Sequence, residues 1–249
     1  MTPLIIAHRG DSANRPENTA VSFKSALELG ADLLELDVQL TRDGQVVVIH
    51  DGSVDRTTDG RGRVADLTLA EIRKLSAGYP ERFGDRYASE KVPTLAEVLN
   101  LARGRSRLMI EIKKESVAES DDEEGIEAKT VAAVGEARME GDVLLISFDR
   151  RALRRVRKLA PEIRRGHLFY KASPDEVVEG AREVETDLVM PEKGMLSDEL
   201  TTAARAAGLK VATWVVDDVE ELKELARFDL FGVGSNRPGA LLDAIWASD

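Results

Sequence analysis

The sequence predicts an α/β fold, a TIM-type (β/α)8 barrel with a small insertion after the second strand. Short apolar runs alternate with longer helical patterns along the chain, which is typical of βα units in a parallel sheet. Eight such runs are present, and eight parallel strands with helices between them close into a barrel. The predicted strands cover residues 4–8, 33–38, 108–113, 143–148, 165–170, 187–191, 210–216 and 231–235.

Chain length agrees with one domain. The 249 residues, 43% of them hydrophobic, can bury one large core and fall in the size range of a single α/β barrel. We therefore expect residues 1–249 to form one barrel domain. Residues 51–93 are loop-rich and then helical, and we expect them to form an insertion over the barrel mouth.

Capping signals locate the helices. Asn18 is the expected N-cap of a helix over residues 19–29 that Gly30 ends, and Ser197 is expected to open a helix that ends at Gly208. Further helices are predicted over residues 68–75, 94–102, 149–159, 174–185, 218–226 and 238–246.

Composition excludes several classes of protein. Without cysteine there is no disulfide, thiolate nucleophile or cysteine-ligated zinc. A formal net charge of -11 argues against a general affinity for nucleic acid or anionic lipid. The first residues contain too few consecutive apolar side chains for an export signal or a membrane anchor, so a cytoplasmic location is expected. The oligomeric state is left open, and the highly charged run 119–124 is predicted to be a solvated loop.

A short hairpin is predicted beside the second barrel strand. Residues 45–50 form a strand candidate that only four residues, 41–44, separate from the strand ending near Leu40. So short a connection makes a hairpin, and hairpin strands are antiparallel. Pairing back from the turn places Ile49 or His50 opposite Asp37. His50 should therefore lie beside the carboxylates of Glu35 and Asp37.

Three acidic residues are candidates for a metal site. Glu35 and Asp37 alternate with apolar residues and project to the same side of their strand, and Glu111 and Lys113 repeat this spacing on the next barrel strand. Strands of a barrel have room for polar groups at the mouth, because helices cover them outside. Clustered carboxylates repel one another, and a divalent ion that prefers oxygen ligands relieves the repulsion. The pattern predicts a Mg²⁺ or Ca²⁺ site.

The remaining candidates carry imidazoles and positive charges. His8 and Arg9 end the first strand at the predicted mouth, where His50 and Lys113 also gather. One imidazole can take a proton from an attacking oxygen, the other can protonate a leaving oxygen, and the cations can hold phosphoryl oxygens. With the metal, these are the parts needed to split a phosphodiester.

Three other residues receive simpler interpretations. Glu17 is interpreted as an exposed carboxylate in the first turn of a helix, where a negative charge interacts favourably with the helix dipole. This role is preferred over that of a metal ligand. Trp214 is a candidate for the apolar wall of a substrate pocket. His167, in the middle of a predicted strand, is expected to be packed rather than catalytic.

A series of short motifs runs along nearly the whole chain. They are HRG at 8–10, PENT at 16–19, GAD at 30–32, ELDVQLTRDG at 35–44, VIHD at 48–51, RTT at 56–58, PTLAEVL at 93–99, EIK at 111–113, ISF at 146–148 and W at 214. In sequence and in order, these motifs resemble the glycerophosphodiester phosphodiesterase family.

The resemblance implies an activity and a role for each site residue. The family hydrolyses glycerophosphodiesters to sn-glycerol 3-phosphate and an alcohol, on a barrel with an insertion after the second strand. Its matching positions make His8 the general base, His50 the general acid, Glu35, Asp37 and Glu111 the metal ligands, and Arg9 and Lys113 the phosphate contacts. The small-molecule diester is the implied partner.

Two rival functions stay open. One is a lysophospholipase D or sphingomyelinase D-like phosphodiesterase on the same type of barrel. The other is a non-catalytic glycerophosphodiester-binding barrel, although such a protein would be expected to have lost a histidine or a metal carboxylate.

The resemblance departs from the family near the C-terminus. Where the family often reads WTVN, this chain has WVVD at 214–217, and where it often reads ITDRP, this chain has GSNRP at 234–238. Neither departure changes a metal carboxylate or a histidine, so the expectation is that they concern substrate preference and not the reaction.

Overall fold

A computed structural model describes residues 2–117 and 125–246 and contains one nine-stranded sheet. The strand order is β1-β9-β8-β7-β6-β5-β4-β2-β3, and β1 also pairs with β2, so eight parallel strands close into a barrel. All eight predicted strands are confirmed to within two residues at each end. They are β1 (Leu4–His8), β2 (Leu33–Leu40), β4 (Arg107–Ile112), β5 (Val143–Ser147), β6 (Arg164–Phe169), β7 (Leu188–Pro191), β8 (Lys210–Trp214) and β9 (Gly232–Ser235).

The long strand β2 has two partners along one edge. Its first half pairs with β1 in parallel, and its second half pairs with β3 (Val46–Val48) in the antiparallel sense. The backbone N–H of Ile49 donates to the carbonyl of Asp37 at 3.0 Å. The predicted hairpin is thereby confirmed, with Ile49 as the residue opposite Asp37, and β3 stands outside the closed barrel.

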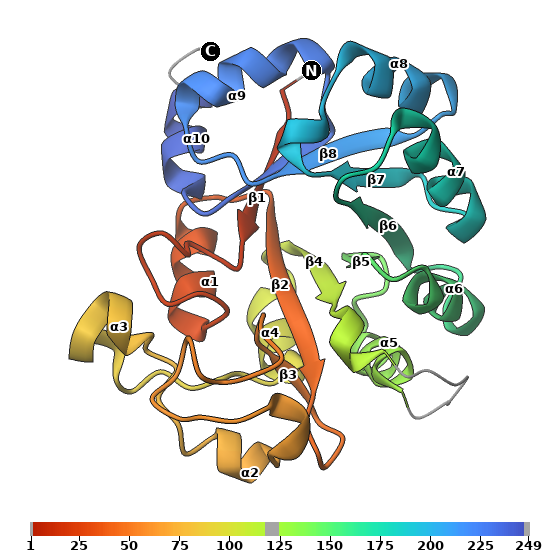
Figure 1. Cartoon of the computed structure of the whole chain (residues 1–249). Coiled ribbons are helices and arrows are strands. Elements are labelled where there is room, and N and C mark those ends of the chain that lie inside the picture. Colours follow the sequence, from red (N-terminus) through yellow and green to blue (C-terminus); the bar gives the residue numbers. More distant parts are fainter. Residues whose placement is uncertain (1, 118–124, 247–249) are drawn as a thin grey trace.

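Helices surround the barrel (Figure 1). Seven of the predicted helices are present in this ring. The eighth helix of the ring, α5, was not predicted. Its apolar face repeats at Ile126, Thr130, Val134 and Ala137, but its N-cap Gly125 offers no side-chain cap. The ring comprises α1 (Ala20–Glu28), α4 (Leu95–Ala102), α5 (Ile126–Ala137), α6 (Arg150–Leu159), α7 (Pro174–Val184), α8 (Asp198–Ala206), α9 (Val219–Leu225) and α10 (Pro238–Trp246).

Two local predictions are wrong. Thr19, not Asn18, is the N-cap of α1, because the Thr19 side chain accepts from Ser22 while Asn18 has a left-handed backbone with φ of 57°. The helix expected over 68–75 is only one turn long, α2 (Leu69–Ile72), which a capping box starts at Thr68. The predicted loop 119–124 lies outside the described residues.

Barrel closure separates two kinds of buried side chain. Leu34 and Leu36 of β2 pack outward among residues of the surrounding helices, whereas Leu33 packs inward with Met109 and Ile146. Alternation along the strand therefore directs the next inward positions, Glu35 and Asp37, into the barrel near its mouth.

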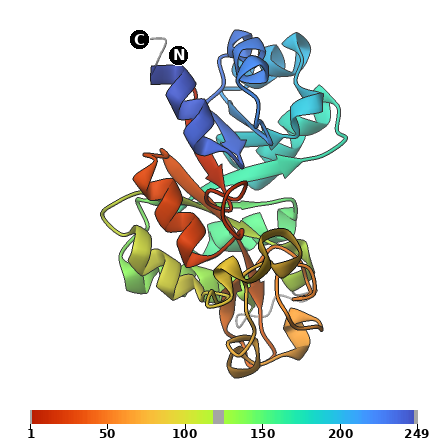
Figure 2. The ribbon, with the colours of Figure 1, turned by 90° about the vertical axis from the view of Figure 1, so that its left-hand side faces the viewer.

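The segment between β3 and α4 has a small apolar cluster of its own. This segment includes α2 and the short helix α3 (Pro80–Phe83), which was not predicted. Both helices stand apart from the helix ring (Figures 1 and 2). Buried residues of this cluster include Val54, Val64 and Ile72. Within the described residues, no helix has the length and apolar character that crossing a bilayer requires.

Candidate active site

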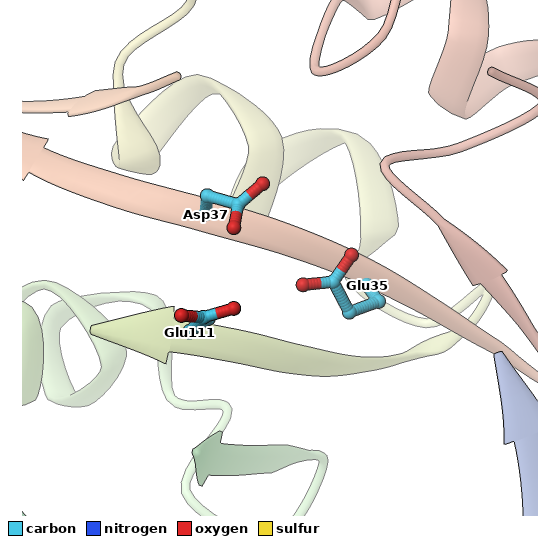
Figure 3. A group of neighbouring side chains, drawn as sticks. All are labelled: Glu35, Asp37 and Glu111. Atoms are coloured by element: carbon cyan, nitrogen blue, oxygen red, sulfur yellow. The ribbon is translucent and has the colours of Figure 1, made fainter. Parts of the chain in front are cut away.

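Three buried carboxylates meet inside the barrel mouth. Glu35 and Asp37 come from β2, and Glu111, the register partner of Asp37, comes from the adjacent strand β4. One oxygen of each group lies within 4.8 Å of the others, and Figure 3 shows Glu111 facing the two carboxylates of β2. The structure thus brings together the three residues that the sequence proposes as metal ligands.

The three carboxyl groups differ in their affinity for protons. Burial and the charge of Asp37 raise the pKa of Glu35 well above its usual value and the pKa of Glu111 to about 7. Burial also opposes the charge on Asp37, but Arg9 and Lys113 outweigh it and hold the pKa of Asp37 below its usual range. Asp37 is therefore the permanent negative charge of the cluster, and a cation would be needed to ionise all three groups.

Two cations sit against this cluster. The Nε of Arg9 lies 3.1 Å from Oδ2 of Asp37. Lys113 Nζ lies 2.8 Å from Oε1 of Glu111 and 3.5 Å from Oδ1 of Asp37. Burial lowers the pKa of Lys113, but Asp37 and Glu111 outweigh burial and raise it, so the ammonium stays charged.

The donor set fits a hard divalent ion. It consists of three carboxylates, whose oxygens are the ligands that Mg²⁺ and Ca²⁺ take in proteins. In addition, Oδ1 of Asp37 is buried and accepts no hydrogen bond from any residue in 2–117 or 125–246. A buried oxygen that accepts no hydrogen bond within a carboxylate cluster fits the role of a metal ligand.

His8 lies at the edge of the cluster. It is the register partner of Glu35, and its Nε2 is 4.0 Å from Oε2 of that residue. Its Nδ1 lies 2.8 Å from Oδ1 of Asn236. Burial, and then the charge of Arg9, lower the pKa of His8 to about 4, so the imidazole is neutral near pH 7.

His50 has a different partner. Its Nδ1 lies 2.6 Å from Oδ1 of Asp51. Burial opposes the charge on Asp51, but its hydrogen bonds with Arg56 and His50 outweigh burial and lower the pKa of Asp51 to about 2. The second imidazole is thus held by an ionised carboxylate.

Several residues at the site were not assigned a role from the sequence. Arg56 donates to Asp51 at 2.7 Å and to Glu17 at 2.7 Å, and Glu17 also accepts from Arg9 at 3.0 Å. The interpretation of Glu17 as an exposed first-turn carboxylate is therefore wrong: the side chain is nearly buried, and α1 begins after Thr19. The RTT run at 56–58 was the only sequence signal that pointed to Arg56.

Two further corrections concern neighbouring amides. Asn18 does not cap a helix; its Nδ2 donates to Oδ2 of Asp37 at 2.9 Å. Asn236, one of the departures from the family motif, contacts His8 directly. The expectation that these departures concern substrate preference alone does not fit that contact.

A cavity of about 120 Å³ joins the charged groups to an apolar wall. Trp214 belongs to this wall and stacks edge-on against Phe148 with ring centroids 5.8 Å apart. Its indole N–H donates to the carbonyl of Met190 at 3.1 Å, so the ring and not a polar atom faces the cavity. His167 is buried beside Phe169, which agrees with the expectation that it is packed. The lining residues are Ile6, His8, Arg9, Glu35, His50, Glu111, Lys113, Ile146, Phe148, Leu168, Met190, Trp214 and Gly234.

Known proteins with similar sequences and structures share one family. The model of the glycerophosphoryl diester phosphodiesterase family matches residues 8–240. A glycerophosphodiester phosphodiesterase of Caldanaerobacter subterraneus subsp. tengcongensis is 42% identical over 246 residues, which cover 98% of each chain. One from Bacillus subtilis is 34% identical over 250 residues, covering 94% of this chain and 84% of its own.

A solved phosphodiesterase structure is also similar to this chain. A phosphodiesterase of Oleispira antarctica in complex with the product sn-glycerol-3-phosphate superposes with a TM-score of 0.86 at 31% identity, covering 98% of this chain and 97% of its own. The chain therefore belongs to the glycerophosphoryl diester phosphodiesterase family of enzymes.

Proposed function

We propose that this protein hydrolyses glycerophosphodiesters to sn-glycerol 3-phosphate and an alcohol with the help of a divalent metal ion. The observation that carries the proposal is one cavity in which Glu35 and Glu111 of the carboxylate cluster, two cations and two differently partnered imidazoles face an apolar wall. The activity named for the relatives supports it, as does the product in the Oleispira structure.

Glu35, Asp37 and Glu111 would hold the ion, and Mg²⁺ or Ca²⁺ suits their oxygens. Such an ion polarises phosphoryl oxygens and neutralises the charge that develops on them. Arg9 and Lys113 would bind the remaining phosphoryl oxygens from the same side of the cavity.

The two histidines would divide the proton transfers. His8 is neutral near pH 7, so its imidazole can take the proton of the attacking oxygen as the new bond to phosphorus forms. As the bond from phosphorus to the alcohol breaks, His50 would give its proton to the departing oxygen. Solvent then returns a proton to His50 and removes one from His8.

The apolar wall would accommodate the glycerol carbons. Trp214 and Phe148 line the apolar part of the cavity, in contrast to the charged residues that line the rest. Neither offers a free polar atom to a headgroup, since the indole N–H of Trp214 is already bonded to Met190. A three-carbon unit next to a phosphate matches a small cavity that is charged on one side and apolar on the other.

The chain architecture forms part of the proposal. We treat residues 1–249 as one barrel domain with 51–93 as an insertion over the mouth. Two contacts of residues 51–93 support this: Asp51 bonds to His50, and Arg56 bonds to Glu17.

Turnover measurements test the activity and the substrate class. Glycerophosphocholine should be cleaved in Mg²⁺ or Ca²⁺ and not in excess EDTA, with sn-glycerol 3-phosphate as the product. A His50→Ala variant should bind metal with unchanged affinity and lose most turnover. Preference for lysophosphatidylcholine would overturn the substrate assignment, and absence of any diester cleavage in metal would overturn the activity.

Isotope labelling separates two nucleophiles. The attacking oxygen is either water or the neighbouring glycerol hydroxyl, and the second route passes through a cyclic phosphate. A reaction in ¹⁸O-labelled water, quenched at early times, should contain an unlabelled cyclic species only if the hydroxyl attacks. Labelled product with no cyclic species at any time would assign the attack to water.

A further inference from the structure

The side chain of Asn236 lies between His8 and a second carboxylate outside the metal cluster. Its Oδ1 is 2.8 Å from Nδ1 of His8, although the two residues are 228 positions apart in the chain. Its Nδ2 donates to Oδ2 of Asp217 at 2.8 Å, and its backbone N–H donates to Oδ1 of Asp217 at 2.7 Å. His8 is the last residue of β1, Asp217 follows β8, and Asn236 follows β9.

Asp217 determines which way the amide of Asn236 points. A carboxylate can only accept hydrogen bonds, so the NH₂ group of Asn236 must face Asp217 and the carbonyl oxygen must face His8. The reversed amide would place two acceptors 2.8 Å apart. Ser12 is compatible with either orientation, because its hydroxyl lies 2.9 Å from Oδ1 of Asn236 and 2.8 Å from the carbonyl oxygen of His8 and has one hydrogen to donate.

The orientation of this amide in turn determines the tautomer of His8. An amide oxygen only accepts, so Nδ1 of His8 must carry the hydrogen. The lone pair of the neutral ring is then on Nε2, the nitrogen that lies 4.0 Å from Glu35 at the carboxylate cluster. A base with its lone pair on Nδ1 would point it at Asn236 and away from the substrate.

We propose that Asn236, oriented by Asp217, is a positioning residue that holds His8 as the Nδ1–H tautomer with Nε2 available as the base. The inference rests on the proposed role of His8 as general base. It adds two residues that touch neither the metal cluster nor the apolar wall to the set on which turnover depends.

Each of the two residues stands at a position where the chain departs from the family motif. The chain has Asp217 where the motif WTVN ends in asparagine, and Asn236 where the motif ITDRP has aspartate. The structure puts these two side chains in direct contact. At these two positions the chain has the carboxylate and the amide in the reverse order of the motif.

Variants of the pair separate positioning from structural support. Asn236→Leu removes the acceptor at similar size, and it should lower kcat on the order of 10²-fold with little change in KM, because a wrong tautomer costs turnover and not substrate binding. Asp217→Asn alone and Asn236→Asp alone should each lower kcat by a smaller factor. The double exchange Asp217→Asn/Asn236→Asp should restore most of it, since an amide at 217 can donate to a carboxylate at 236.

The tautomer can be observed without any substrate. The chain has three histidines, so ¹⁵N-histidine NMR of the Mg²⁺-loaded protein at pH 7.5 gives few signals, and His8→Gln identifies those of His8. Wild-type His8 should show Nδ1–H, whereas Asn236→Leu should shift it toward Nε2–H. The exposed Asn100, substituted Asn100→Leu, serves as the control and should change neither signal nor kcat.

Three results would overturn the proposal: an unchanged His8 tautomer in Asn236→Leu, a change in KM alone, or a double exchange no better than the single variants. The NMR readout also keeps this inference separate from the proposed function. A tautomer that shifts in a protein that cleaves no glycerophosphodiester would leave the positioning intact and reject only the substrate.

Discussion

The two sides of the barrel mouth differ in chemistry although they are built from equivalent strand ends. On the side of β1, β2 and β4, inward positions carry His8, Glu35, Asp37 and Glu111. On the side of β5 to β8, the residues that line the same cavity are apolar, namely Ile146, Phe148, Leu168, Met190 and Trp214. Under the proposed function, the contrast assigns the reaction to the charged half of the mouth and the shape of the substrate to the apolar half.

The physical demands on the two halves also differ. Buried charges are tolerated only when they are paired, and Arg9 and Lys113 supply that pairing for Asp37 and Glu111. The apolar half is stabilised by burial itself and needs no partners. Substitutions on the charged half should therefore reduce kcat, and substitutions on the apolar half should mainly raise KM.

The largest effect is expected from Glu111→Gln. Loss of one carboxylate oxygen from the metal cluster should weaken Mg²⁺ or Ca²⁺ binding and lower turnover roughly 10³-fold, because a bound ion contributes several kcal/mol to the transition state. Metal titration by calorimetry and turnover at saturating metal measure the two effects. Glu127→Gln, which changes another buried glutamate on α5, is the matched control and should keep both.

The same variant should change how stability depends on pH when metal is absent. The pKa of Glu111 is raised from 4.5 to about 7 in the folded protein, so between these values the folded state binds more protons than the unfolded state. The contribution of Glu111 to the free energy of unfolding is therefore fully present below pH 4.5. As pH rises from 4.5 to about 7, the free energy of unfolding falls by up to about 3 kcal/mol.

Denaturant unfolding in EDTA from pH 4.5 to pH 8 measures this contribution. Relative to the wild type, Glu111→Gln should gain stability across that window, because glutamine does not titrate. A difference between the two proteins that stays constant with pH would contradict the assignment of the raised pKa to Glu111.

Arg56→Ala should have an intermediate effect on the charged half. Arg56 joins Asp51, the partner of His50, to Glu17, the partner of Arg9, so its loss should loosen the acid and a phosphate contact together. We expect kcat to fall roughly tenfold, as for other groups that orient site residues. Steady-state kinetics would show this. The control is the exposed Arg42→Ala, which breaks surface contacts with Glu71 and with the carbonyl of Asp66 and should leave kcat unchanged.

The smallest effect is expected on the apolar half. Trp214→Leu removes part of the cavity wall and should raise KM about fivefold, close to 1 kcal/mol of lost apolar contact, while kcat changes less than twofold. Phe231→Leu, which packs against the interior cluster near the start of β9 and does not line the cavity, is the control. If Trp214→Leu instead lowered kcat as much as Arg56→Ala, the division between the two halves would be wrong.

Much of the barrel and of the carboxylate cluster could be predicted from local patterns. Alternation of polar and apolar residues placed Glu35 and Asp37 on one side of their strand. The short turn at 41–44 placed Ile49 or His50 opposite Asp37, and the structure has Ile49 there. The helix α5 was missed because it lacks a capping side chain. Asn18 was misassigned because a helix start favours asparagine at several neighbouring positions, and only the backbone conformation separates it from Thr19.

By itself, the sequence determined the barrel, its hairpin and the three carboxylates, because each depends on spacing within one strand or between consecutive ones. Tertiary structure alone decided the partners of the two histidines. Asp51 adjoins His50 in the chain, but the hydrogen bond from Arg56 to Asp51 depends on how the following loop folds. Asn236 reaches His8 only because β9 pairs with β1 and closes the barrel. Contacts of that kind depend on strand register and barrel closure, which local patterns in the sequence do not encode.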